Sequence, residues 1–237
     1  MKKTFEEFPL KGRPMPDAPS YRDLAYGSPV CRATFLGLLF ALFLTVGGPA
    51  KAAETIKLLV LGDSLVAGYG LRADEAFPAQ LASALAKDGI SAKVLNGGVS
   101  GDTSAGGLAR LGWVLADKPS AAIVCLGAND ALRGLDPAAT RRNLDVLLGR
   151  LKAAGVKVLL AGMQAPPNMG ARYTKAFNGL YAPLAAAHGL PYYPFFLDGV
   201  AGDPALNQND GKHPTAAGVK VIVERMMPSV KNLLGRP

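Results

Sequence analysis

The chain has 237 residues, of which 49% are hydrophobic and 19% are charged. This length accommodates one α/β domain or two very small ones, and the hydrophobic share allows a sizeable core. Two cysteines and two histidines are too few for a disulfide-stapled mini-domain or a Cys/His zinc cluster. The net charge of +8 is dispersed, with no run of five or six basic residues, so we expect no nucleic-acid partner.

Residues 1–52 read as a leader ahead of a folded domain at 53–237. Its first part is polar and proline-rich, which predicts disorder. Arg32 then precedes an apolar run of 14 residues, a Gly-Gly-Pro break and an Ala-x-Ala site ending at Ala52, as in a secretory signal peptide. The run is shorter than the roughly 20 residues that span a bilayer. We therefore expect a periplasmic or secreted protein cleaved near Ala52; the alternative is an inner-membrane anchor at residues 33–50.

From Ile56 onward, short apolar strands alternate with amphipathic helices. The expected strands cover residues 56–61, 92–95, 121–126, 156–160 and 192–196. Helices are predicted from Phe77, over 104–118, from Pro137 until Gly155 ends the helix, over 173–188 with a kink at Pro183, and over 215–227. This alternation predicts an α/β protein with a parallel five-stranded sheet covered on both faces.

Ligands of such sheets bind outside the carboxyl ends of the strands. The first strand leads into Ser64, the second into a glycine-rich loop with Gly101, and the third into Asn129. Asp210 and His213 lie just before the last helix. A nucleophile, oxyanion donors and an acid–base pair would therefore share one edge of the sheet. A serine hydrolase needs this set, although each residue alone has a simpler explanation, such as a serine that caps a helix.

The same blocks, in the same order, resemble the SGNH-hydrolase superfamily, also called the GDSL lipases and esterases. The blocks read GDSL at 62–65, SGDTS around Gly101, GAND at 127–130 and DGKHP at 210–214. Longer segments, LLVLGDSLVAGYG, SGDTSAGGLARL and PFF at 194–196, are similar to the subgroup of periplasmic thioesterase I, lysophospholipase L1 and arylesterase. The resemblance covers residues 55–235 and implies a flavodoxin-like, three-layer α/β/α sandwich.

Carried onto this sequence, the resemblance implies roles for individual residues. Ser64 would be the nucleophile, His213 the general base and later the acid, and Asp210 the residue that orients His213. The oxyanion hole would consist of the main-chain N–H groups of Ser64 and Gly101 and the side-chain amide of Asn129. No metal and no organic cofactor is implied.

Two loops are expected to border the substrate. Residues 131–136 would form the mobile substrate loop of the subgroup, and the loop at 164–170 would either line an acyl groove or be an ordinary rigid connection. The predicted substrate-binding residues of these loops are Ala131, Leu132, Arg133, Gln164 and Pro166. The expected partner is a small acyl ester, thioester or lysophospholipid. The protein is expected to be a monomer, and a transient membrane contact is left open.

These inferences together predict an exported serine esterase or thioesterase that works through an acyl-enzyme on Ser64. One alternative is a carbohydrate O-acetyl esterase of the same superfamily, because the shape of the pocket sets the substrate. Another is a non-catalytic, membrane-tethered binding protein.

The remaining chemistry-bearing residues are expected to be structural. Cys125 lies in an apolar strand and should be inert core, and His188 lies near the end of a helix. Asp63 and Asp130 should order turns by accepting main-chain N–H groups. The G-x-G-x-x-A pattern at 68–73 is displaced from the strand–helix junction, so we expect no dinucleotide cofactor.

Overall fold

The computed structural model describes residues 55–236. The predicted leader, its cleavage near Ala52 and the alternative anchor at 33–50 lie outside this range. Among the helices of residues 55–236, none is both long enough and apolar enough to cross a membrane.

Within the described residues, five parallel strands form one sheet, as the sequence predicts. In chain order the strands are β1 (Ile56–Gly62), β2 (Ala92–Gly98), β3 (Ala121–Cys125), β4 (Lys157–Ala161) and β5 (Tyr192–Tyr193). Their order across the sheet is β2-β1-β3-β4-β5. In the pairing of β1 with β3, Gly62 lies opposite Cys125. The carboxyl ends of these two strands therefore meet at one edge of the sheet.

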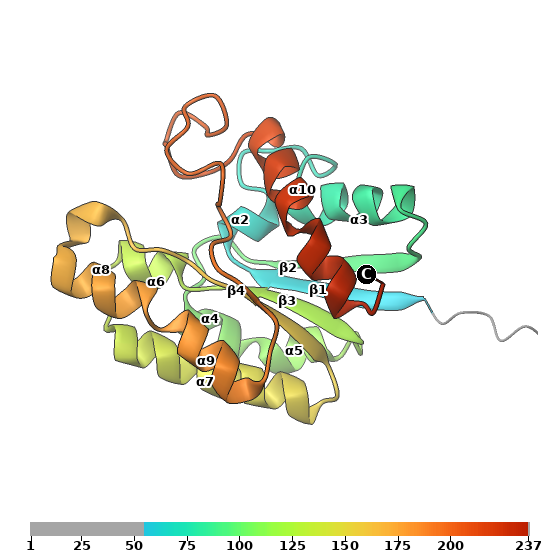
Figure 1. The fold of residues 1–237 in the computed structure, drawn as a ribbon, viewed down its shortest axis with the longest axis horizontal. Helices are drawn as coiled ribbons and strands as arrows, with labels where there is room; N and C mark the ends of the chain where they lie inside the picture. Colours follow the sequence, from blue (N-terminus) through green and yellow to red (C-terminus); the bar gives the residue numbers. More distant parts are fainter. Residues whose placement is uncertain (1–54, 237) are drawn as a thin grey trace, which may run out of the picture. The chain divides into compact units, whose positions relative to one another are not determined.

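Helices cover both faces of this sheet (Figure 1). One face carries α3 (Phe77–Lys87) and α10 (Ala216–Leu233). The other face carries α4 (Ser104–Ala109), α5 (Leu111–Leu115), α7 (Pro137–Ala153) and α9 (Tyr181–His188). Two short helices, α2 (Ser64–Ala67) and α6 (Ala128–Leu132), follow β1 and β3, and α8 (Ala171–Asn178) follows a turn after β4. The predicted three-layer α/β/α sandwich is confirmed.

The hydrophobic core lies between the sheet and its helices. β3, which includes Cys125, is buried along its whole length, as expected of a strand that is covered on both faces. α7 turns its predicted leucine stripe into the core, and full burial of each leucine contributes about 1.5–3 kcal/mol. The stripe consists of Leu144, Leu147, Leu148 and Leu151. The carboxylate of Asp136 caps this helix by accepting the N–H of Ala138 at 3.0 Å, also as predicted.

Two helices that the sequence predicts as continuous are divided in the structure. The helix expected over 104–118 breaks at Arg110, whose φ of −94° and ψ of 4° depart from helical geometry. Glycines within this stretch weaken a continuous helix. The helix expected over 173–188 breaks at Gly179, which ends α8. Pro183 consequently lies in the first turn of α9 instead of in the middle of a helix, at a position where N–H groups have no helical acceptor to lose.

Two element ends also differ from prediction. The last helix continues through Pro228 instead of ending at Met227, because Val230 beyond it is still buried in the core. Burial of that apolar face outweighs the one hydrogen bond that the proline removes. The fifth strand pairs with β4 over two residues only, instead of over 192–196. Beyond this pair, the main-chain N–H of Phe196 donates to the oxygen of Gly162, just after β4, at 2.9 Å.

Close approach of chain segments requires glycine where β1 and β2 end. A Cβ on Gly62 would lie 2.3 Å from Cγ2 of Val66 and 2.9 Å from the main-chain oxygen of Cys125. A Cβ on Gly98, at the end of β2, would lie 2.2 Å from the main-chain nitrogen of Ala67. These two glycines let α2 begin directly after β1, against the end of β2.

Candidate active site

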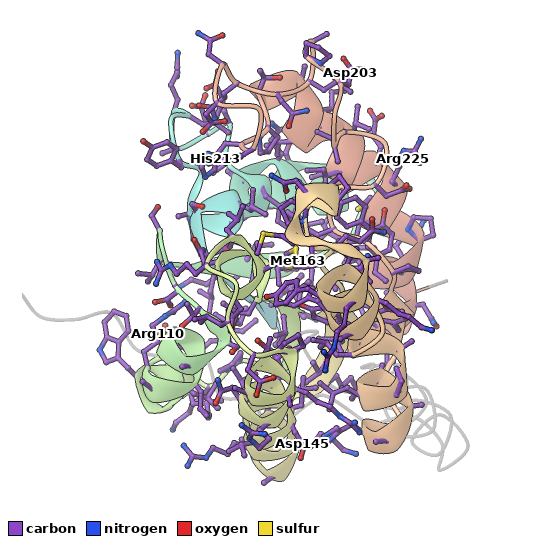
Figure 2. All side chains as sticks on the ribbon, turned by 90° about the vertical axis from the view of Figure 1, so that its left-hand side faces the viewer. Arg110, Asp145, Met163, Asp203, His213 and Arg225 are labelled. Atoms are coloured by element: carbon purple, nitrogen blue, oxygen red, sulfur yellow. The ribbon has the colours of Figure 1, made fainter. Side chains whose placement is uncertain are left out.

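Ser64 is the first residue of α2 and follows β1 after a single intervening residue. That residue, Asp63, caps the helix, because its Oδ1 accepts the N–H of Leu65 at 3.0 Å. The helix ends after four residues at Gly68, which has a left-handed φ of 83°. Ser64 is thereby held at the carboxyl edge of the sheet, the edge that faces the viewer in Figure 2 and includes His213.

His213 lies within hydrogen-bond distance of the other two residues of the predicted triad. Its Nε2 is 2.8 Å from Oγ of Ser64, and its Nδ1 is 2.5 Å from Oδ2 of Asp210. The second oxygen of Asp210 accepts the main-chain N–H groups of His213 at 3.0 Å and Lys212 at 2.9 Å. The structure thus brings together all three side chains, in the order that nucleophile activation requires.

These hydrogen bonds favour the ionised form of Asp210. The bond from the His213 side chain, followed by the main-chain N–H groups of His213 and Lys212, lowers the pKa of Asp210 well below its usual range. A carboxylate here favours the imidazole tautomer with its proton on Nδ1. Nε2 then presents a lone pair to the hydroxyl of Ser64, as a general base must.

The three predicted oxyanion donors line one cavity. Gly101 has a φ of 85°, a conformation that favours glycine. Within the described residues, the main-chain N–H groups of Ser64 and Gly101 donate no hydrogen bond. The side-chain Nδ2 of Asn129 donates to Oδ2 of Asp63 at 3.1 Å and to the main-chain oxygen of Asp102 at 2.9 Å. The two main-chain donors are therefore free to bind a substrate oxygen, whereas the amide of Asn129 is already hydrogen-bonded within the protein.

The two aspartates expected to order turns do so. Asp63 is fully buried, and burial is the main cause that raises its pKa to about 6. Asp130 is buried too, and its carboxylate accepts the N–H of Ser104 at 2.7 Å, the hydroxyl of Ser104 at 2.5 Å and the hydroxyl of Thr140 at 3.1 Å. The link from Asp63 to the amide of Asn129 was not predicted.

Arg110, which the sequence did not single out, connects three segments of the site. Its Nε donates to Oδ2 of Asp102 at 2.5 Å, and its Nη2 donates to the main-chain oxygens of Gly62 at 2.9 Å and Gly97 at 2.7 Å. The side chain is only 17% exposed. One guanidinium thus fixes the ends of β1 and β2 and the loop that carries Gly101.

The triad opens into a cavity of about 550 Å³. Ser64, His213 and the oxyanion donors form its polar side. Its other walls are largely apolar and include Leu132, Met163, Ala165, Pro166, Pro167, Phe195 and Leu197. Such a cavity has room for an acyl chain beside the reacting carbonyl.

The predicted substrate-binding residues divide into two groups. Leu132, Gln164 and Pro166 line the cavity, so the loop at 164–170 borders the site. Ala131 is fully buried in the core and is not among the lining residues, because its side chain packs inward from α6. Arg133 does not line the cavity either, and its Nη2 donates to the main-chain oxygen of Gly101 at 2.8 Å. Sequence reasoning missed Tyr69, Met163 and Leu197 as cavity residues. Tyr69 lies within the LLVLGDSLVAGYG segment but was assigned no role there, and the other two positions have no motif to mark them.

Other titratable groups take no part in this arrangement. The thiol of Cys125 is fully buried, and burial raises its pKa. Nε2 of His188 lies 2.7 Å from Oδ1 of Asp145 and joins α9 to α7. Among residues 55–236, no group of three or more histidine, cysteine, aspartate or glutamate side chains could hold a metal ion.

A serine, a histidine and an aspartate in hydrogen-bond contact, with amide donors beside them, form the kind of site that defines a serine hydrolase. The sheet places this site where parallel α/β sheets bind their ligands. The chain belongs to the GDSL-like Lipase/Acylhydrolase family, whose model matches residues 60–221. The match spans every predicted member of the triad and the oxyanion hole.

Curated relatives cover most of the same region. Esterase TesA of Pseudomonas aeruginosa is 45% identical over 184 residues, which are 77% of this chain and 90% of that protein. Thioesterase 1/protease 1/lysophospholipase L1 of Escherichia coli K12 is 40% identical over 200 residues, 84% of this chain and 93% of that protein. The crystal structure of TesA is 44% identical, has a TM-score of 0.72 and covers 75% of this chain and 99% of that one. The crystal structure of AlinE4, an SGNH-hydrolase family esterase, is 48% identical and has a TM-score of 0.65. The match covers 78% of this chain and 99% of AlinE4.

Proposed function

We propose that this GDSL-family hydrolase is a serine esterase and thioesterase that forms an acyl-enzyme on Ser64. One observation carries the proposal: Oγ of Ser64 lies 2.8 Å from Nε2 of His213, at the mouth of a largely apolar cavity. The names of the relatives, which include esterase, arylesterase and thioesterase, support the same reaction class.

In the first half of the reaction, Nε2 of His213 removes the hydroxyl proton as Oγ of Ser64 attacks the acyl carbonyl carbon. Asp210 holds Nδ1–H and stabilises the imidazolium that forms. The carbonyl oxygen becomes an oxyanion and receives the N–H groups of Ser64 and Gly101. The amide of Asn129 joins them when it exchanges the oxygen of Asp102 for the oxyanion.

In the second half, the tetrahedral intermediate collapses and the bond to the alcohol or thiol breaks. His213 transfers its proton to that leaving group and is again a base. Water then loses a proton to Nε2 and attacks the acyl carbon, which forms a second tetrahedral intermediate. As this intermediate collapses, the bond from the acyl carbon to Oγ of Ser64 breaks, His213 returns the proton to Oγ, and the carboxylic acid is released. These steps need proton transfer and oxyanion stabilisation, which residues of this chain supply.

The substrate class is proposed from the walls of the cavity. Leu132, Met163 and Leu197 offer apolar contacts that suit an acyl chain better than a sugar. We further propose that acyl esters, thioesters and lysophospholipids are the substrates, and that the enzyme acts as a monomer outside the cytoplasm. The composition of the leader supports that location.

Hydrolysis of p-nitrophenyl acetate, octanoate and palmitate tests the proposal. Ser64→Ala should lower kcat by more than about 10³-fold. Ser120→Ala is the matched control, because this serine lies at the opposite edge, where it contacts the main chain of Lys57. Preference for octanoate supports an acyl-chain enzyme, whereas hydrolysis of acetate alone favours the O-acetyl esterase alternative. Equal inactivity of wild type and Ser64→Ala on all three esters would contradict the proposed activity.

A further inference from the structure

The ring of Tyr69 lies against the ring of the catalytic histidine. The ring centroids of Tyr69 and His213 are 4.6 Å apart, and their planes make an angle of 36°. Tyr69 follows the end of α2 and lines the cavity, although its side chain is 54% exposed. Single exposed aromatic side chains are common on protein surfaces, so it is the contact with His213 that distinguishes Tyr69.

Hydrogen bonds join the turn of Tyr69 to the loop of His213 through one glutamine. Nε2 of Gln208 donates to the main-chain oxygens of Tyr69 at 2.8 Å and Pro214 at 2.9 Å. The main-chain N–H of Gln208 donates to the oxygen of His213 at 2.7 Å. A Cβ on the next residue, Gly70, would lie 2.3 Å from Oε1 of Gln208, so the two segments are in close contact. These contacts hold the main chain of Tyr69 next to the loop of His213.

Both nitrogens of the His213 imidazole are already hydrogen-bonded, so a further side chain can contact the ring on its two faces. Asp210 and Ser64 take the two ring nitrogens in the plane of the imidazole. Tyr69 takes one face. The face of an aromatic ring attracts a cation, and His213 is a cation whenever both ring nitrogens carry a proton, as they do after it receives the proton of Ser64.

We propose that Tyr69 is a positioning residue for the reaction, acting through His213. Its ring keeps the imidazole plane aligned between Asp210 and Ser64 and stabilises the imidazolium as the acyl-enzyme forms. This inference rests on the proposed function for its kinetic consequences. The contact between the two rings exists without any substrate, so it also has a readout that does not depend on turnover.

Three charged groups surround the same imidazole. Asp210 contacts it directly, the buried carboxylate of Asp63 acts on it through space, and the exposed ammonium of Lys212 precedes it in the chain. All three are unchanged by a substitution at Tyr69. The hydroxyl of Tyr69 makes no hydrogen bond with any described residue, so the effect belongs to the ring rather than to the phenol.

The kinetic test compares Tyr69→Leu and Tyr69→Phe on p-nitrophenyl acetate, whose acyl group is too short to need the far walls of the cavity. Tyr69→Leu should lower kcat about three- to tenfold with little change in KM, and should move the acid limb of kcat/KM about 0.5 pH unit lower. The direction follows because the protonated imidazole loses a stabilising contact. Tyr69→Phe should retain both values. Trp113→Leu, which removes a side chain that is 80% exposed on α5, is the control.

The second readout is the proton titration of the histidines by NMR, which is simple in a chain with two histidines. In Ser64→Ala and in wild type, Tyr69→Leu should lower the titration midpoint of His213 by about 0.5 pH unit and leave His188 unchanged. Tyr69→Met repeats the measurement if the leucine variant is unstable. A change in KM alone, an unmoved midpoint, or a loss in Tyr69→Phe equal to that in Tyr69→Leu would overturn the proposal. The titration decides it even if the protein hydrolyses none of the esters.

Discussion

The buried carboxylate of Asp63 accepts a hydrogen bond from the side-chain amide of Asn129, at 3.1 Å. Because a carboxylate can only accept, this contact requires the nitrogen of the amide, not its oxygen, to point toward Asp63. This hydrogen bond therefore fixes the orientation of the Asn129 side-chain amide, with its N–H groups directed toward the site. Asp63, the second residue of the GDSL block, thus orients a donor 66 positions away in the chain.

The first prediction concerns that donor. Asn129→Ala should lower kcat about 10²–10³-fold and change KM little, because in the proposed mechanism the amide donates to the oxyanion rather than to the bound ester. Steady-state kinetics on a p-nitrophenyl ester give both values. Asn232→Ala, at an exposed position near the end of α10, is the matched control and should behave as wild type. An unchanged kcat in Asn129→Ala would show that this residue does not belong to the oxyanion hole.

The second prediction concerns the pH dependence of stability. Burial raises the pKa of Asp63 to about 6, above the ordinary value of about 3.9. Between these values the folded protein binds a proton that the unfolded chain does not, so this group makes folding more favourable as the pH falls. Relative to Asp63→Asn, wild type should therefore gain about 2 kcal/mol in its free energy of unfolding between pH 7.5 and 4.5.

Urea unfolding of wild type and Asp63→Asn at the two pH values checks this difference. Asp210, whose lowered pKa acts in the opposite sense as the pH falls through its folded value, is present in both proteins and cancels. The prediction is wrong if the difference between the two proteins is the same at both pH values.

The third prediction concerns Arg110. Arg110→Lys keeps the charge beside Asp102 but cannot reach the oxygens of both Gly62 and Gly97, so kcat should fall about tenfold or more as the Gly101 loop shifts. The free energy of unfolding should fall by about 2 kcal/mol, because hydrogen bonds of a largely buried charge are lost. Arg72→Lys is the control.

The pair of Arg72 with Asp74 is more than two-thirds exposed on both sides. Exposed pairs of this kind contribute little, so the control should change neither kcat nor stability. If both lysine variants behave alike, the three contacts of Arg110 are not what positions the loop.

The fourth prediction uses two glycines with opposite surroundings. Gly62→Ala should destabilise the protein by about 1–3 kcal/mol and abolish most activity, since its Cβ would strike Val66 and the main chain of Cys125. Gly112→Ala should stabilise it by about 0.5–1 kcal/mol, because Gly112 lies within α5 and nothing is within 4 Å of its Cβ position. Thermal unfolding of wild type and both variants measures the two changes in stability, which should have opposite signs. Equal effects would contradict the packing described at the end of β1.

Sequence reasoning reached the fold and the triad because both leave local signals. Alternating apolar strands and helices marked the sheet. Short blocks at strand ends marked Ser64 and Asn129, and a block just before the last helix marked His213. Those blocks carry chemistry in consecutive residues, so they can be recognised without coordinates. Their meeting at one edge follows from the topology of a parallel sheet.

The supporting residues Arg110 and Tyr69 lie within the quoted segments SGDTSAGGLARL and LLVLGDSLVAGYG, but these segments do not show what the two side chains contact. Arg110 bonds to oxygens of the main chain, which every residue possesses, so nothing in the sequence marks its partners Gly62 and Gly97. Tyr69 contacts His213 across 144 positions in the chain, and that proximity depends on how two loops pack. The division of the helix at Arg110 is equally hard to predict, because the tertiary contacts of Arg110 act together with the weak helix propensity of the nearby glycines.

The hydrogen bond from Asn129 to the main-chain oxygen of Asp102 affects how strongly the site would bind the ester in its ground state and in the transition state. Replacing that oxygen by the carbonyl oxygen of a bound ester exchanges one neutral acceptor for another, so the complex gains little from the exchange. Once the substrate oxygen carries negative charge, it is the stronger acceptor and the exchange becomes favourable. In the proposed mechanism, the amide of Asn129 would therefore bind the oxyanion of the transition state more strongly than the carbonyl oxygen of the bound ester, which would raise kcat without lowering KM.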